Sequence, residues 1–210
     1  MARSGYRVYF GDNSATQSDL DHIEEVVVEQ TMDRAWQAHV RLFMCLDEKG
    51  RWKHTASEFA KPFSRLRLEL QVGGSAFVPL IDGPVAAYEH TLDSQPGRST
   101  VTLVAHDDSV LMDREEGNEV FEDRADDAIA REVFGRTPAI ASTRIQSSSA
   151  PDHVAVRRET PIAFLRKLAE AIGFHAYVLP GDQRGKSIGC FLPDPTAPGR
   201  LQETLRGDSY

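Results

Sequence analysis

The stretch of this chain closest to a catalytic motif is Gly181-Asp182-Gln183-Arg184-Gly185-Lys186-Ser187. Glycines, a lysine and a serine in this order bind phosphate in a P-loop, which needs one more residue between its glycines and opens a helix. Here Pro180 precedes the first glycine, and the run after Ser187 is typical of a strand. The sequence therefore predicts a hairpin turn, and we expect no nucleotide or other cofactor.

The histidines and cysteines do not have the spacing of metal ligands. The seven histidines are His22, His39, His54, His90, His106, His153 and His175. They form no HxH or HxxxH pair, and neither Cys45 nor Cys190 belongs to a CxxC motif. We therefore predict no metal site. Two cysteines are too few for a disulfide framework, which favours a reducing compartment.

Acidic residues crowd the segment from Asp107 to Asp127, which holds ten acids and two bases. It lacks the D-x-D-x-DG pattern and the closing glutamate of a calcium-binding loop. We interpret it as a solvated turn and helix N-terminus. An anionic surface that lines a channel or faces a basic partner is the alternative.

Nucleophilic catalysis has no candidate with a supporting motif. The triplet Ser147-Ser148-Ser149 lies in the polar run 142–151, which we interpret as a connector, and no GxSxG sequence occurs. We expect no catalytic residue, and we expect that the chain is not an enzyme.

Charge and hydropathy exclude several classes of protein. The 210 residues carry a formal net charge of −8, from 32 acids and 24 bases, which argues against a general nucleic-acid binder. The N-terminus has no apolar run of signal-peptide length, and no apolar stretch is long enough to span a membrane. We expect synthesis in the cytoplasm and no membrane partner.

The first half of the chain has the period of β-strands. Residues 37–46 place Val40, Leu42 and Met44 on one face, and residues 65–72 place Leu66, Leu68, Leu70 and Val72 on one face with Arg65, Arg67, Glu69 and Gln71 on the other. An Ile-Val-rich run lies at 22–29, and 99–106 alternates with β-branched residues. Such alternation indicates antiparallel strands with one buried and one wet face. Asp82-Gly83-Pro84 interrupts an apolar segment from about 76 to 90 and indicates a bulge or corner.

Two helices are expected in the second half. The first covers about 123–134, with an apolar stripe through Ile129 and Val133 and a stop at Gly135. The second begins after the N-cap candidate Thr160, with Pro161 in its first turn, and ends before Gly173. Two short strands, 175–179 and 187–192, follow it, with the hairpin turn described above between them.

The predicted fold class is α+β and mainly β: an antiparallel barrel or sandwich followed by a smaller helix-plus-strand segment. We divide the chain into an N-terminal β-barrel at 1–107, a helix-containing middle segment with the start of a second barrel at 108–192, and a Pro-rich tail at 193–210.

Three stretches, in this order, resemble the phage late control gene D family, which includes tail baseplate hub proteins of contractile injection systems and is related to the N-terminal part of VgrG-type spike proteins. They are 82–85 leading to a strand that ends near His90, then 95–103 followed by Asp107-Asp108 and Leu111-Met112, and then 158–169 followed by Gly173-Phe174 and Tyr177. The likeness covers about residues 5–192 and rests on packing and turn patterns.

The resemblance implies tube-type β-barrels and a structural role. A family member would be a homotrimeric hub or tube–spike adaptor that joins the inner tube to the central spike, with a tube protein, a VgrG-type spike and other baseplate components as partners. It would act in virion or particle assembly, as part of a tail-like particle. A full hub continues into a second barrel where this sequence has its Pro-rich tail. We therefore expect a fragment, a shortened relative, or a second barrel completed by another chain.

Two other functions stay open at this point. A tail-associated glycan- or cell-wall-binding module would need exposed aromatic side chains for sugar stacking, and Trp36 and Trp52 are the candidates. A tail-associated hydrolase would need paired catalytic groups, for which the sequence offers little support.

Overall fold

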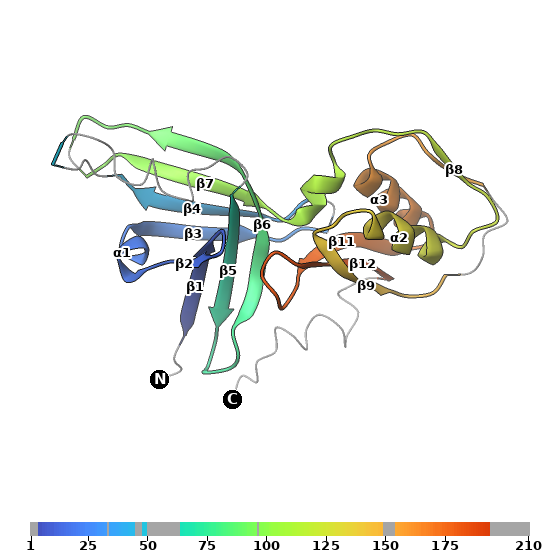
Figure 1. The fold of residues 1–210 in the computed structure, drawn as a ribbon, viewed down its shortest axis with the longest axis horizontal. Helices are drawn as coiled ribbons and strands as arrows, with labels where there is room; N and C mark the ends of the chain where they lie inside the picture. The colour runs from blue at the N-terminus through green and yellow to red at the C-terminus, as the bar shows by residue number, and fades with distance from the viewer. Residues whose placement is uncertain are drawn as a thin grey trace. The chain divides into compact units, whose positions relative to one another are not determined.

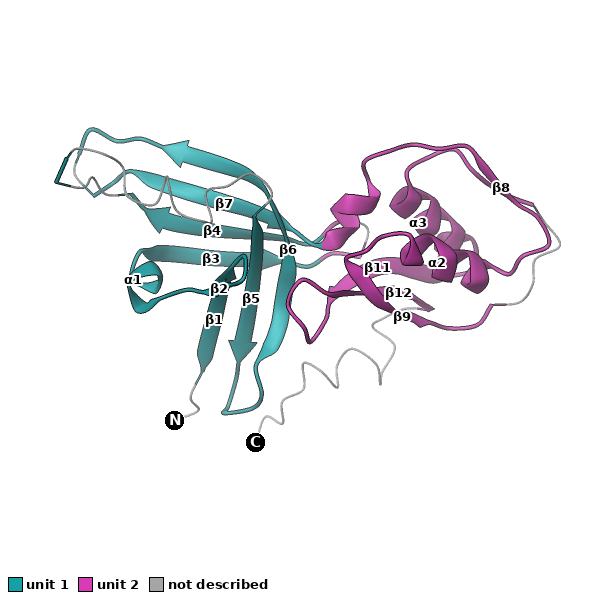
Figure 2. Ribbon diagram, in the orientation of Figure 1, with its two compact units in different colours: residues 1–30, 36–107 teal, residues 31–35, 108–210 magenta. Residues whose placement is uncertain are grey.

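The computed structural model describes residues 4–32, 34–44, 48–49, 64–95, 97–148 and 154–193. The chain forms two compact units (Figure 2): unit 1 comprises residues 1–30 and 36–107, and unit 2 comprises residues 31–35 and 108–210. Trp52 and the predicted tail after Pro193 lie outside the described residues.

Unit 1 is one curled antiparallel sheet with the strand order β2-β1-β5-β6-β7-β4-β3 (Figure 1). Its elements are β1 (Gly5–Phe10), β2 (Asn13–Ser14), α1 (Gln17–Leu20), β3 (Ile23–Glu29), β4 (Gln37–Phe43), β5 (Arg65–Gln71), β6 (Val78–Thr91) and β7 (Thr100–His106). The predicted mainly β class, with an antiparallel sheet followed by a smaller helix-and-strand segment, is confirmed. The sheet is a half-barrel with two end strands, β2 and β3.

The corner predicted at Asp82-Gly83-Pro84 lies inside the long strand β6. Residues 78–84 of β6 pair with β5, and residues 85–91 pair with β7, with a register shift between Val85 and Ala87. A Cβ atom on Gly83 would overlap the backbone carbonyl of His106 in β7, so this position requires glycine. The corner lets one strand serve both halves of the curled sheet.

Side-chain alternation is confirmed in β4 and only partly in β5. Val40, Leu42 and Met44 are buried, as expected for the inner face of β4. In β5, Leu66 and Leu68 are buried, but Leu70 is 37% exposed. Arg67, expected on the wet face, is 3% exposed because it pairs across the strands with the buried Asp82. The prediction of one buried and one wet face is therefore wrong at Arg67 and Leu70 of β5.

Unit 2 combines a three-stranded sheet, two helices and a two-stranded ribbon. The sheet has the order β11-β12-β9, and the ribbon pairs β10 with β8. The elements are the 3₁₀ turn η2 (Asp108–Met112), β8 (Glu119–Phe121), α2 (Asp126–Gly135), β9 (Ile140–Ile145), β10 (Ala155–Arg157), α3 (Pro161–Ala171), β11 (Phe174–Pro180) and β12 (Ser187–Pro193). Helices α2 and α3 lie over the sheet and pack on β9 and β11 (Figure 1).

Both predicted helices occur, with shifted ends. Helix α2 begins at Asp126 rather than near 123, since Asp123 has a left-handed φ of 51°, and Gly135 is its last residue rather than a stop beyond it. Helix α3 starts after Thr160 with Pro161 in its first turn, and Gly173 follows it with a φ of 71°. The Thr160 hydroxyl donates to Asp113 Oδ1 at 2.6 Å instead of capping the helix.

The predicted connector at 142–151 is wrong for its first four residues, which belong to β9. Strand β9 pairs in parallel with β12, far along the chain. A parallel pair needs a crossover connection, so local sequence carries little signal for it. The core beneath the helices includes Phe134 and Phe191, both fully buried, and a Cβ on Gly189 of β12 would lie 2.6 Å from the Phe134 ring.

Across the described part of the chain, no helix has the length and apolar character needed to cross a membrane.

Candidate interaction surface

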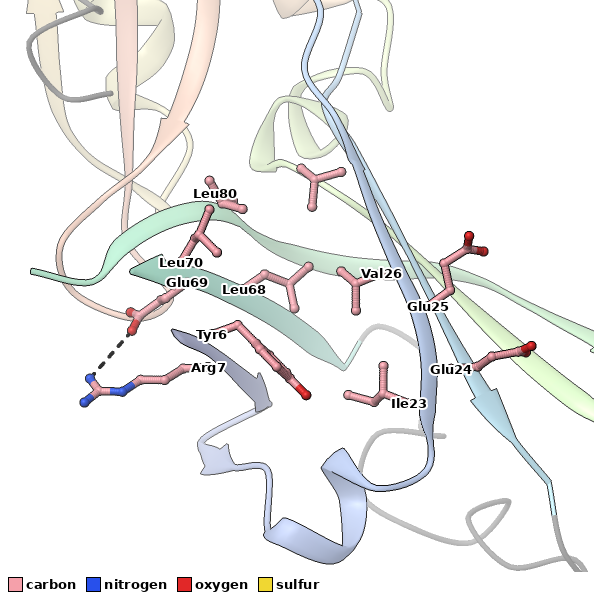
Figure 3. Close-up of a pocket in the computed structure, with 11 residues that line it drawn as sticks. Tyr6, Arg7, Ile23, Glu24, Glu25, Val26, Leu68, Glu69, Leu70 and Leu80 are labelled. Atoms are coloured by element: carbon pink, nitrogen blue, oxygen red, sulfur yellow. Dashed lines mark ion pairs between the residues drawn. The ribbon is translucent and has the colours of Figure 1, made fainter. Parts of the chain in front are cut away.

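A hollow in unit 1 lies where the described part of the half-barrel stays open, between its end strand β3 and the strands β1, β5 and β6. We call this hollow the seam; its cavity volume is about 510 Å³. Figure 3 shows Ile23 and Val26 of β3 facing Tyr6 of β1 and Leu68 of β5, while Glu24 and Glu25 point away. The residues that line it are Tyr6, Arg7, Ile23, Glu24, Glu25, Val26, Val28, Leu68, Glu69, Leu70 and Leu80.

The walls of the seam are apolar and accessible. Tyr6 is 53% exposed, Val26 38% and Leu70 37%, whereas Leu68 at its floor is 4% exposed. A contiguous patch of exposed apolar side chains often marks a binding surface.

The backbone edges beside the seam are unpaired among the described strands. Strand β3 is an end strand of the sheet and pairs with β4 on its other side. Strand β1 pairs with β2 through Tyr9 and Phe10, which leaves the same side of residues 5–7 without a partner strand. At one end the seam is bridged by a hydrogen bond from the Gln30 side-chain amide to the Leu80 carbonyl, at 2.9 Å.

Acidic side chains surround the seam. Strand β3 contains three glutamates and no base. Glu24 and Glu25 share the guanidinium of Arg41, at 2.8 and 3.1 Å. On the opposite wall, Glu69 lies 4.0 Å from Arg7, so the charges that line the seam are three acids and one base.

A buried ionic network lies along β5 behind this wall. Asp82 accepts hydrogen bonds from Arg65 Nε and Arg67 Nη1, both at 3.0 Å, and Arg67 Nε donates to Glu69 Oε1 at 2.7 Å. Asp82 and Arg67 are almost fully buried. Removing one member would leave the other charged and desolvated, so a change in the register of β5 and β6 that separated Asp82 from Arg67 would be costly.

The P-loop-like stretch is a hairpin turn, as predicted. Residues 181–186 connect β11 to β12, and Ser187 begins a strand rather than a helix. The Gly181 amide donates to the Lys186 carbonyl at 2.8 Å, which closes the turn. The Ser187 hydroxyl donates to Asp108 Oδ2 at 2.7 Å in a buried pair, so it is engaged within unit 2.

Other sequence candidates lie apart from one another. Within the described residues no three of the His, Cys, Asp and Glu side chains gather as they would around a metal ion. His54, Cys45, His153 and Ser149 lie outside those residues. Cys190 is fully buried, and burial raises the pKa of its thiol to about 12. Burial likewise raises the pKa of the neighbouring Tyr177 hydroxyl.

The acidic run at 107–127 is less solvated than predicted. Asp107, Asp108 and Asp126 are at most 2% exposed. Asp107 accepts a hydrogen bond from the Trp36 amide, and Asp108 accepts one from Ser187. These pairings offset the cost of burying the carboxylates of Asp107 and Asp108.

Trp36 does not present a stacking surface, because it is 8% exposed. The sequence reasoning also missed the seam, although a signal for it was present. Three consecutive valines, Val26 to Val28, place apolar side chains on both faces of β3, which a strand with one wet face does not require. A second group of exposed valines, Val120, Val154 and Val156, lies at the ribbon of unit 2.

The fold, a curled antiparallel half-barrel followed by a helix-covered sheet, is one found in phage tail and type VI secretion proteins. One such structure is the 43 kDa tail protein of prophage MuSo2 from Shewanella oneidensis, with a TM-score of 0.61, 13% identity, and coverage of 89% of this chain and 53% of that one. No family model and no curated protein matches the sequence.

Two further structures extend the comparison to a type VI secretion component and a VgrG complex. An Escherichia coli type VI secretion component with structural similarity to the bacteriophage T4 tail proteins gp27 and gp5 matches with a TM-score of 0.60 and 9% identity, over 92% of this chain and 50% of that one. A Francisella PdpA-VgrG complex in its half-lidded form matches with a TM-score of 0.56 and 12% identity, over 99% of this chain and 34% of that one. The chain thus spans about half the length of its matches or less.

Proposed function

We propose that this chain is a structural hub or adaptor subunit of a contractile phage tail or tail-like injection system, where it joins the inner tube to the central spike. The observation that carries the proposal is the shared fold, which extends over 89–99% of the chain in tail and type VI secretion structures. The sequence resemblance to the late control gene D family points the same way and supplies the more specific hub role.

The proposed partners follow from this role: further copies of the chain in a homotrimer, a tube protein, and a VgrG-type spike. Among the described residues, the strand edges beside the apolar seam are unpaired, which supports a role in assembly, because a protein that works alone normally covers such edges. We propose that the chain has no catalytic activity and becomes part of an assembled particle. Trp36 does not support the glycan-binding alternative, because its ring is buried and cannot stack on a sugar.

Light scattering on the purified chain, alone and mixed with tube and VgrG-type spike proteins from the same genome, tests the proposal. A trimer of the 23.3 kDa chain, or a mixed complex with either protein, is the expected result. A monomer that persists in the presence of both proteins would contradict the hub role.

A further inference from the structure

The seam has the features of a site that is completed by one more β-strand. On one side lies the unpaired edge of β3, and on the other lies the unpaired part of β1 at residues 5–7, as far as the described residues extend. Edge strands present outward N–H and C=O groups at alternate residues. A strand between them would find hydrogen-bonding groups on both of its sides.

The cavity suits the side chains of such a strand. Successive side chains of a strand point to opposite faces, so every second one would enter the cavity of about 510 Å³. There it would contact Val26, Leu68 and Leu70. Aliphatic side chains therefore fit the inner positions of the added strand.

The charge around the seam indicates which residues suit the positions of the added strand whose side chains point away from the cavity. Three of the four charged residues that line the seam are glutamates, and β3 itself adds Glu29. The single guanidinium of Arg41 is shared between Glu24 and Glu25, so it does not neutralise both carboxylates. Basic side chains on the incoming strand would complement this surface and favour its association.

The same charges disfavour pairing of two copies through β3. An edge-to-edge β3–β3 contact would bring the glutamates of IEEVVVE against those of the other copy. Like charges that face each other across strands are destabilising. The whole chain also carries a net charge of −8.

We infer that the seam binds an extended segment of a partner protein as an added β-strand, and that this segment alternates aliphatic with basic residues. The inference deepens the proposed function and rests on it for the existence of an assembly partner. The chemistry of the seam can be tested on the isolated chain.

Fluorescence anisotropy with labelled synthetic peptides is the direct test. The probe is a peptide of alternating lysine and valine; one control replaces every lysine by glutamate, and another replaces the central valine by proline, which removes a backbone donor. We expect the lysine peptide to bind about tenfold more tightly than either control, and to weaken as salt screens the glutamates.

Two valines of β3 provide a matched pair of variants. Val26 lines the seam at 38% exposure, whereas its neighbour Val27 does not line it and is 39% exposed. Val26→Ser should weaken binding of the lysine peptide about tenfold, as expected for a lost apolar contact, and Val27→Ser should change it less than about twofold. Leu70→Ser, at another exposed wall position, should act like Val26→Ser.

Of the other outcomes, the first two below would decide against the inference, and the third would bear on the hub role alone. Equal binding of the lysine and glutamate peptides, or equal effects of the two valine variants, would overturn it. Self-association that Val26→Ser abolishes, without any peptide binding, would assign the seam to a second copy instead. Peptide binding in a chain that ignores tube and spike proteins would support the seam and count against the hub role alone.

Discussion

The two units differ in how the apolar face of their sheet is covered. In unit 2, helices α2 and α3 cover the sheet, and the core around Phe134 and Phe191 is filled. In unit 1, the sheet curls on itself but does not close within the described residues, and Tyr6 and Val26 are exposed beside the seam. Unit 2 thus has a filled core beneath its helices, whereas unit 1 leaves apolar side chains exposed beside the seam, which in our proposal another chain covers.

The units also differ in what fixes their strands. In unit 1 the pairing of β5 with β6 is reinforced by the buried contacts of Arg65 and Arg67 with Asp82. In unit 2 the ionic groups around Arg136 lie nearer the surface, and aromatic packing fills the interior, including the stacked rings of Phe121 and Phe164 at 5.6 Å. Substitutions in each unit can therefore test whether these differences are real.

The largest expected effect is that of Phe134→Ala, which would empty the centre of unit 2. We expect a loss of about 3–5 kcal/mol in its free energy of unfolding, since the ring is fully buried. In a Cys45→Ser background, the rate of Cys190 thiol labelling measures opening of unit 2. Trp36 is buried in unit 1 and Trp52 lies within the residue range of that unit, so tryptophan fluorescence reports unit 1 separately. An equal shift of both signals would show that the two units unfold together, which would contradict the view that each unit has its own core.

Asp82→Asn should be the most damaging conservative change in unit 1. It keeps the shape of the side chain but removes a buried carboxylate charge that pairs with Arg67, while the contact of Arg67 with Glu69 remains, at a cost of about 3 kcal/mol. Denaturation followed by tryptophan fluorescence measures this loss. Glu25→Gln, which alters an exposed pair with Arg41, is the control and should cost less than about 1 kcal/mol. Similar costs for the two variants would mean that the buried network does not hold β5 to β6.

Gly83→Ala tests the corner that lets unit 1 curl. The added methyl would collide with the His106 carbonyl, so β6 and β7 must separate locally, at a cost of about 2 kcal/mol. Ala86→Ser, at an exposed position three residues along the same strand, should have an effect within about 0.5 kcal/mol. Tryptophan fluorescence again measures both variants. A neutral Gly83→Ala would show that the corner does not depend on this close approach.

The sequence predicted the elements whose signals are local. Strand β4 alternates along its length, and helix α3 carries its own start and stop residues, Thr160, Pro161 and Gly173. Strand β9 was missed because its polar sequence forms a strand through a parallel partner distant in the chain. The burial of Arg67 was missed for a similar reason, since its cross-strand partner Asp82 becomes known only once β5 and β6 are paired.

The seam was beyond sequence reasoning for a different reason. Its lining comes from four strands, and its existence depends on the half-barrel remaining open between β1 and β3. Strand alternation gives the inner face of each strand but not whether the sheet closes. The run Val26 to Val28 was a usable hint, since it makes both faces of β3 apolar.

The smallest expected effect concerns the surface ion pairs of unit 2. Arg136 donates to Glu119 at 2.6 and 2.8 Å and also contacts Glu132, and these hydrogen bonds hold the pKa of both glutamates below their usual value of 4.5. Arg136→Gln should cost about 0.5–1 kcal/mol at neutral pH, since the groups are partly exposed. Arg131→Gln, which loosens a 3.9 Å contact with Asp127, is the control and should cost less.

The cost of Arg136→Gln in unfolding free energy should depend on pH, and the lowered pKa values give the direction of this dependence. A carboxylate with a lowered folded-state pKa stabilises the fold above its unfolded pKa, and this contribution is lost as pH falls through the folded value. The gap between wild type and Arg136→Gln should therefore be full at pH 7 and vanish at pH values well below 4.5. The cost of Phe134→Ala should persist across this range, because no charge contributes to it. If the difference in unfolding free energy between wild type and Arg136→Gln stayed constant at low pH, Arg136 would stabilise unit 2 by packing, as Phe134 does. The ion pairs of Arg136 would then not distinguish the surface of unit 2 from its core.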